Sequence, residues 1–201
     1  MKYLVVFLVI AMGEITIGEA KSCLQCQAEG TNDCTGSPVT CQDNFDSCTT
    51  SFTFMSFLNS FKSVVTKGCT SILPLCYNDI TLAAHNAKLV HHNQCCYQDN
   101  CNVGSIIMPR QNTTKNGYYC PSCFVEGSTV CNRPAKYACY GNNEDCFEYI
   151  GAGVFPGGQP NKYYIAGCIT KKACTYKYST ILRSLIGYGA IRCSSGQTAN
   201  N

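Results

Sequence analysis

The chain has 201 residues, a formal net charge of +3, 18 cysteines and no tryptophan. All of the cysteines follow residue 20, and in a secreted chain this density is typical of a disulfide scaffold. Their even number lets every thiol enter a bridge, so thiolate metal ligands are not expected.

Residues 1–20 are predicted to be a secretory signal peptide, with a membrane anchor as the alternative. Met1-Lys2 is a short basic start, residues 3–12 are apolar, and Gly18-Glu19-Ala20 offers small residues for cleavage. The apolar run is too short for a membrane span, and the polar end of the chain lacks the hydrophobic tail of a lipid-anchor signal. We therefore expect a secreted, extracellular protein without a membrane anchor.

The cysteine spacing after the signal occurs twice. Ten cysteines from Cys23 to Cys101 are separated by 3, 8, 7, 7, 21, 7, 19, 1 and 5 residues, and eight from Cys120 to Cys193 by 3, 8, 8, 7, 22, 6 and 19. Seven consecutive separations agree to within one residue, which predicts two copies of one unit. We expect one domain at residues 21–102, a linker at 103–119, and a second domain at 120–201 that lacks the last bridge.

The loop between Cys48 and Cys69 is the first candidate for a partner surface. Residues 51–54 alternate polar and apolar, as a half-buried strand does. Uncharged apolar residues then crowd together, and such side chains are typical interface anchors. Packing against a neighbouring strand or the second domain is the alternative. The candidate residues are Phe52, Phe54, Met55, Phe57, Leu58 and Phe61.

The next loop contains all three histidines, His85, His91 and His92. Histidines without nearby acidic or thiolate ligands are a poor metal pattern, so we expect solvated loop residues. Residues 83–90 are expected to form a short helical turn. No phosphate loop, nucleophile elbow or nucleic-acid module is recognisable, and we predict no enzyme activity and no cofactor.

The linker contains two features. Asn112-Thr113-Thr114 is an N-glycosylation sequon, and a linker is accessible to modification. Ile106, Ile107 and Met108 form an apolar segment that is also a candidate for partner binding.

The second domain is predicted to contain strands at residues 162–166 and 175–179, with a turn at 156–161 before the first of them. From residue 108 onward there are ten basic and four acidic residues, against four and six in residues 21–107. Such a basic region can attract acidic proteins or anionic lipid headgroups; an ordinary solvated face is the alternative. The candidate residues are Lys171, Lys172, Lys177 and Arg183.

The C-x-x-C at the start of each unit and Cys95-Cys96 to Cys101-Asn102 at the end of the first resemble the urokinase-receptor and snake-toxin three-finger superfamily. The resemblance implies two tandem, mainly β, three-finger domains. It also implies the bridges Cys23–Cys48, Cys26–Cys34, Cys41–Cys69, Cys76–Cys95, Cys96–Cys101, Cys120–Cys146, Cys123–Cys131, Cys139–Cys168 and Cys174–Cys193.

Two groups within this superfamily share the layout of ten and then eight cysteines. The junction Asn116-Gly-Tyr-Tyr-Cys-Pro121 resembles gamma-type phospholipase A2 inhibitors, which implies a secreted binding protein with a phospholipase partner and possible oligomers. The segment from Cys34 to Cys41 resembles amphibian sodefrin-precursor-like factors, which implies a pheromone-like signal or a receptor partner. A defence component of secretions is a third possibility. The linker contains only Pro109, whereas the inhibitors typically have a proline-rich linker.

Overall fold

The computed structural model describes residues 21–71, 76, 79–175 and 187–198, so the predicted signal peptide lies outside the described residues. The predicted mainly β fold is confirmed. The first domain contains β1 (Ser22–Glu29), β2 (Ser37–Thr40), β3 (Ser47–Phe57), β4 (Ser60–Thr70), β5 (Ile80–Ala84) and β6 (Ala87–Cys96). The second contains β7 (Lys115–Glu126), β8 (Ala135–Tyr140), β9 (Asp145–Gly153), β10 (Asn161–Ile169), the 3₁₀ helix η1 (Ala173–Thr175), β11 (Gly187–Ser195) and β12 (Gln197–Thr198).

Nine disulfides join the 18 cysteines, in the pairs that the family resemblance implies. They are Cys23–Cys48, Cys26–Cys34, Cys41–Cys69, Cys76–Cys95, Cys96–Cys101, Cys120–Cys146, Cys123–Cys131, Cys139–Cys168 and Cys174–Cys193. No bridge crosses from one set of cysteines to the other. Each domain is therefore stapled separately, with each bridge contributing about 2–4 kcal/mol, mainly by restricting the unfolded chain.

The long fingers of the first domain are β-hairpins. Strand β3 pairs with β4 on one side and with β6 on the other, along its whole length. The alternating residues 51–54 lie in β3, as predicted. The β3–β4 turn consists of Leu58 and Asn59, and Leu58 adopts a positive φ of 52°. Two-residue turns of this kind match the twist of the strands that they join.

The helical turn expected at residues 83–90 is wrong, because this segment forms the β5–β6 hairpin. Ala84 pairs with Ala87 around a turn of His85 and Asn86, and Asn86 has a φ of 60°. Asparagine tolerates this left-handed conformation. Pairing of β6 with both β5 and β3 satisfies its backbone groups in a way that an isolated helical turn would not.

The second domain contains the predicted strand at residues 162–166, which is part of β10, and the predicted turn lies between β9 and β10. Of the strand expected at 175–179, Thr175 lies in η1 and the other residues lie outside the described part of the chain. Strand β7 begins at Lys115, inside the segment predicted to be a linker.

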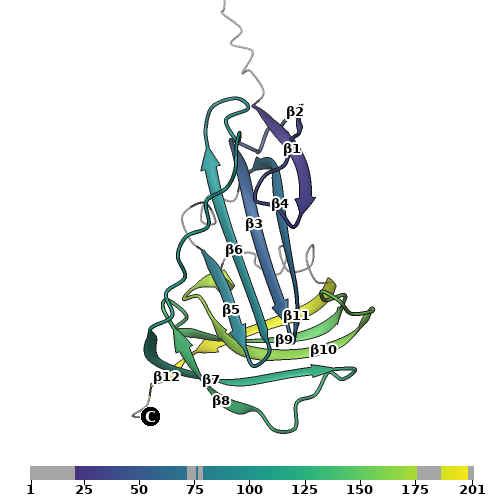
Figure 1. Ribbon diagram of the computed structural model, residues 1–201. Helices are drawn as coiled ribbons and strands as arrows, with labels where there is room; N and C mark the ends of the chain where they lie inside the picture. The colour runs from purple at the N-terminus through teal and green to yellow at the C-terminus, as the bar shows by residue number, and fades with distance from the viewer. Residues whose placement is uncertain (1–20, 72–75, 77–78, 176–186, 199–201) are drawn as a thin grey trace, which may run out of the picture.

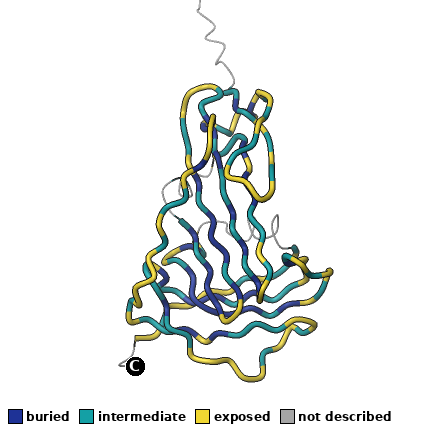
Figure 2. Tube along the Cα trace, in the orientation of Figure 1, coloured by how far each residue is buried: buried dark blue, intermediate teal, exposed yellow. Residues whose placement is uncertain are grey.

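The two domains share one sheet and one core. Strand β10 pairs with β5, so that the strand order runs β11-β9-β10-β5-β6-β3-β4-β1-β2 (Figure 1). The largest apolar cluster draws on both domains, with residues such as Phe57 and Leu89 packed with Tyr149, Phe155 and Ile165. In Figure 2 the buried stretches of both domains converge where the tips of β3 and β6 meet the second domain. The interface between the domains is thus the main hydrophobic core of the protein.

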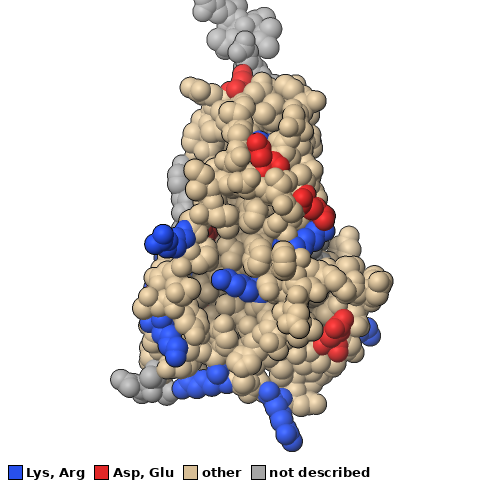
Figure 3. Space-filling view, viewed as in Figure 1, with Lys and Arg blue, Asp and Glu red and all other residues tan. Residues whose placement is uncertain are grey.

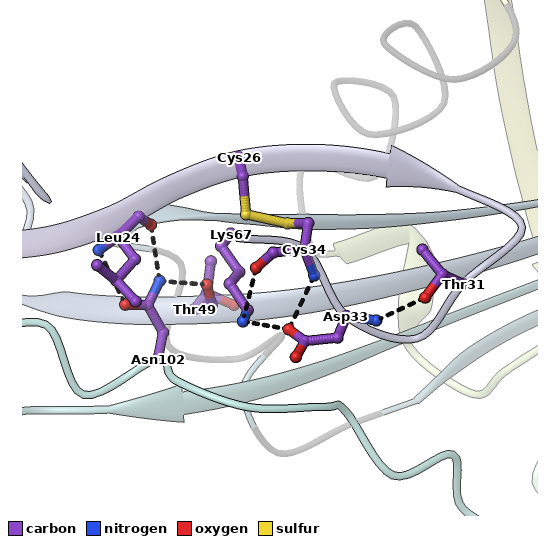
Figure 4. Close-up of polar contacts among 8 residues, drawn as sticks. All are labelled: Leu24, Cys26, Thr31, Asp33, Cys34, Thr49, Lys67 and Asn102. Atoms are coloured by element: carbon purple, nitrogen blue, oxygen red, sulfur yellow. Dashed lines mark hydrogen bonds and ion pairs between the residues drawn. A yellow bond between two sulfur atoms is a disulfide. The ribbon is translucent and has the colours of Figure 1, made fainter. Parts of the chain in front are cut away.

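Far from this interface, two buried polar side chains hold the first domain together (Figure 4). The Asn102 amide accepts a hydrogen bond from Leu24 N and donates to Leu24 O and Thr49 O, which ties the end of the first domain to β1 and β3. Lys67 is only 2% exposed, and its Nζ lies 2.5 Å from Asp33 Oδ1 and 3.1 Å from Cys34 O. The hydrogen bond from Lys67 is the main reason that the pKa of Asp33 is lowered.

Candidate binding surface

The apolar residues of the β3–β4 finger divide between two faces of the sheet. Met55 and Phe57 are buried, and both belong to the core shared by the domains. The ring of Phe57 lies 3.9 Å from that of Phe155 and 6.1 Å from that of Phe124, centroid to centroid. The prediction that Met55 and Phe57 form part of a partner surface is therefore wrong. The structure instead shows the alternative, in which Met55 and Phe57 pack against the second domain.

The opposite face of the same finger is accessible. Because side chains alternate along a strand, Phe52 and Phe54 point away from the shared core, and both are half-buried. Phe61 on β4 stacks on Phe54 with ring centroids 6.4 Å apart, and 74% of Phe61 is exposed. Leu58 in the turn is 58% exposed. We call Phe54, Leu58 and Phe61, with Phe52 further along the strand, the finger surface.

The finger surface is held in place at its tip. Leu58 N donates a hydrogen bond of 2.7 Å to Asn86 O in the neighbouring β5–β6 turn. On the other side, Ser60 packs against the β9–β10 loop so closely that a Cβ on Gly157 would lie 2.6 Å from Ser60 Oγ. The second domain therefore supports the tip that presents Leu58 and Phe61.

The apolar linker segment is divided in a similar way. Ile106 is 1% exposed, and its N–H donates to Asn32 O at 2.9 Å, so its predicted role in partner binding is wrong. Packing against the first domain has removed this side chain from solvent. Ile107 is exposed and Met108 is half-buried. Among these three residues, Ile107 is the one that is exposed, at 77%.

The basic residues of the second domain have acidic neighbours that the linear sequence does not reveal. Lys171 Nζ lies 2.6 Å from Glu144 Oε2, and this hydrogen bond raises the pKa of Lys171. Lys172 N donates to Asp145 Oδ2 at 2.7 Å. Glu144 in the β8–β9 turn thus balances the charge of Lys171, one of the residues that were expected to attract a partner. Lys177 and Arg183 lie outside the described residues.

The sequence led us to expect that all three histidines are solvated loop residues, but this is wrong for His91 and His92, which lie in β6. His91 is buried in β6 with its Nδ1 2.8 Å from Thr53 Oγ1, and burial, followed by the effect of His92, lowers its pKa to about 4. His92 contacts Asp79 through Nδ1 and Oδ1. His85 is exposed, with its ring 5.4 Å from that of Tyr137 in the second domain. Strand pairing, not a loop, places His91 and His92 on opposite faces of the sheet.

A groove lies at the junction of the two domains and was not foreseen from the sequence. Its volume is about 380 Å³. Figure 3 looks onto a face that is hollowed between the domains, with basic side chains beside the hollow. The walls of the groove come from β5, β6, the segment after residue 109, β8 and the β8–β9 turn. The lining residues are Asp79, Thr81, Ala83, Lys88, Arg110, Gln111, Asn112, Thr113, Tyr137, Tyr140, Gly141, Asn142, Asn143 and Thr170. No local pattern predicts it, because it exists only when the domains are joined.

Fold and surface together define a tandem three-finger protein with a finger surface presented on stapled β-hairpins. The family model of the u-PAR/Ly-6 domain matches residues 19–104 and again residues 116–201, and the chain belongs to this family. Among the described residues, no helix has the length and apolar character needed to cross a membrane.

Several known proteins are similar to this chain in sequence. Protein RoBo-1 of Rattus norvegicus is 32% identical over 95 residues, which are 47% of this chain but only 38% of RoBo-1. A phospholipase A2 inhibitor of the gamma type from Gloydius brevicaudus siniticus is 25% identical over 174 residues, 85% of this chain and 84% of the inhibitor. Phospholipase A2 inhibitor NAI of Notechis ater is 26% identical over 159 residues, 76% and 77% of the two chains. The predicted resemblance to gamma-type inhibitors is thereby confirmed.

Among solved structures, that of mouse TEX101 aligns with a TM-score of 0.37 and 17% sequence identity, over 89% of this chain and 99% of TEX101.

Proposed function

We propose that this chain is an extracellular, non-enzymatic binding protein that inhibits a secreted phospholipase A2 by protein–protein contact. The family is one of disulfide-stapled binding domains, and two relatives that align over most of their length are named phospholipase A2 inhibitors. The finger surface is the region that would contact the enzyme.

The observation that carries this proposal is the exposure of Phe61 beside Phe54. An aromatic ring that is 74% exposed and stacked on a second ring leaves a large apolar area in water. Covering this apolar area with a partner stabilises the complex by roughly 25 cal/mol for each Å² buried. The surface is carried by a hairpin that pairs along its whole length and is supported at its tip. Little conformational entropy is therefore lost on binding.

The charge of the second domain adds a long-range contribution. An excess of basic residues from residue 108 onward favours approach of an acidic partner surface and raises the association rate at low salt. The pairing of Lys171 with Glu144 reduces this contribution locally. We therefore assign the affinity to the finger surface and only the steering to the basic residues.

Titration against a panel of secreted phospholipases A2, measuring both binding and hydrolysis, tests the proposal. Phe61→Ala should weaken binding by about thirtyfold, since a buried aromatic anchor contributes about 2 kcal/mol. Val130→Ala is the matched control, because Val130 is an apolar residue of the second domain that is 59% exposed. It should bind as the unmodified protein does.

Dose-dependent inhibition that is lost with Phe61→Ala and kept with Val130→Ala is the expected result. No binding to any phospholipase at micromolar concentration would contradict the inhibitor function and favour the pheromone-like or receptor-modulating alternative. An equal loss of inhibition in Phe61→Ala and Val130→Ala would show that the finger surface is not the specific contact with the enzyme.

A further inference from the structure

The sequon Asn112-Thr113-Thr114 lies at the wall of the interdomain groove. Asn112 and Thr113 both line the groove, and Asn112 is exposed. Its Oδ1 accepts a hydrogen bond of 2.9 Å from Thr114 N, while its Nδ2 donates to none of the described residues. The side chain packs against Gly141, where an added Cβ would lie 3.2 Å from Asn112 Cβ. Within the described part of the chain, the attachment atom thus has no hydrogen-bond acceptor, and the residue that carries it lines the groove.

The lining of the groove also includes a buried amide, that of Asn143. Asn143 is 5% exposed, and its Oδ1 accepts a hydrogen bond of 3.2 Å from Thr170 Oγ1. Its Nδ2 donates to none of the residues that the structure describes. This N–H can therefore donate to an acceptor oxygen of a ligand in the groove.

Aromatic rings complete the wall. Tyr137 and Tyr140 both line the groove, with ring centroids 6.3 Å apart. A sugar ring has C–H groups that pack on such rings, and hydroxyl and acetamido groups that hydrogen-bond amides and hydroxyls. Aromatic residues with a polar end suit a ligand of this mixed character. The groove volume of about 380 Å³ also falls in the range of about 300–1,000 Å³ that is usual for ligand sites.

We propose that Asn112 carries an N-linked glycan and that its innermost N-acetylglucosamine occupies the interdomain groove. In the transfer, Asn112 Nδ2 attacks C1 of a lipid-diphosphate-linked oligosaccharide. The Nδ2–C1 bond forms, the bond from C1 to phosphate oxygen breaks, the lipid diphosphate leaves, and one Nδ2 proton passes to a base. Tyr137, Asn143 and Thr170 follow Asn112 in the chain, so the groove closes around a sugar that is already attached.

A sugar in this position contacts both domains. Asp79, Thr81 and Lys88 belong to the first domain, whereas Tyr137 and Asn143 belong to the second. The glycan therefore braces the joint between them. The finger surface does not line the groove, so this inference stands independently of phospholipase binding.

Native deglycosylation is the first test, after mass spectrometry of the secreted full-length protein has measured occupancy at Asn112. An amidase that cleaves the Asn–sugar bond should release this glycan at least about tenfold more slowly from native than from reduced, denatured protein, because cleavage requires the groove to open. The control is the double variant Thr114→Ala, Gly127→Asn, which moves the sequon to the β7–β8 loop. Gly127 has a φ of 82° and open space around it, and asparagine tolerates that conformation. The control glycan should be released at similar rates from both forms.

Variants of Thr114 separate the glycan from the side chain that bears it. Thr114→Ser keeps the sequon and should match the unmodified glycoprotein in thermal midpoint and in amide hydrogen exchange at Thr170, whose N–H donates to Thr81 O across the joint. Thr114→Ala lacks the glycan and should exchange faster at this amide. An unoccupied Asn112, release as fast as from the control loop, or identical exchange in the Ser and Ala variants would each overturn the proposal.

Discussion

Gly167 lies against the backbone of Ala83 across the joint between the two domains. A Cβ on Gly167 would stand 2.2 Å from Ala83 O and 2.9 Å from Ala84 Cβ. The corresponding glycine of the first domain, Gly68, has nothing within 4 Å of the same position. The repeat thus contains the same glycine twice, but only the second copy is required for contact between strands of different domains.

Gly167→Ala should loosen the joint. The added methyl group forces β10 away from β5, and overpacking of this kind costs about 1–3 kcal/mol. Thermal unfolding of the oxidised protein and hydrogen exchange at Thr170 measure the effect. Gly68→Ala is the matched control and should be neutral or slightly stabilising, since alanine is favoured over glycine in a strand interior. Equal destabilisation by both variants would show that the close approach at Ala83 is not the cause.

Phe57→Ala should destabilise the protein by about 3–5 kcal/mol, the usual cost of removing a buried phenylalanine. Its ring packs on Phe155, so the cavity opens between the domains. Denaturant unfolding monitored by circular dichroism gives the change. Phe61→Ala, on the exposed face of the same hairpin, should shift stability by no more than about 0.5 kcal/mol. A larger loss of stability for Phe61→Ala than for Phe57→Ala would contradict the assignment of Phe57 to the buried face and Phe61 to the exposed face.

The free energy of unfolding should fall as the pH is lowered from about 6.5 to about 4. Burial lowers the pKa of His91 to about 4, so the unfolded chain binds a proton in this window and the folded chain does not. The loss is about 3 kcal/mol, from about 1.36 kcal/mol for each unit of pKa difference. His91→Gln should remove this slope and His85→Gln should keep it. Denaturant titrations of the oxidised protein near pH 7 and pH 4.5 would detect the difference, and an unchanged slope in His91→Gln would count against this account.

Asp33→Asn should destabilise the first domain more than Lys67→Met does. The first variant leaves the ammonium of Lys67 buried without its carboxylate, whereas the second removes the charge and keeps an apolar side chain of similar length. Combining the two should recover part of the loss. The thermal midpoints of the three variants measure these effects. A smaller decrease for Asp33→Asn than for Lys67→Met would contradict the predicted cost of leaving the Lys67 ammonium without its carboxylate.

The cysteine spacing and its family resemblance were sufficient to predict the two units, because the bridges determine which chain segments lie together within each domain. The alternation in β3 likewise shows that Phe52 and Phe54 share one face, with Met55 and Phe57 on the other. It does not show which face is covered. That depends on how the second domain docks, which only the three-dimensional structure reveals.

The same limit explains the other corrections. The two alanines at 83 and 84 favour a helical turn locally, but two neighbouring strands compete successfully for the backbone of this hairpin. Ile106 looks like an exposed linker residue until its contact with Asn32 is known. The groove combines residues from 79 to 170, so no window of the sequence contains it.

Because every disulfide closes within its own domain, a cut in the connecting segment would leave the two halves without a covalent link. They would stay associated through Phe57, Phe155 and their neighbours, as the two chains of a heterodimer do. The protein therefore resembles a tethered dimer of unequal partners. Reduction of the disulfides would unfold each domain, whereas denaturant or temperature would determine whether the two domains stay associated.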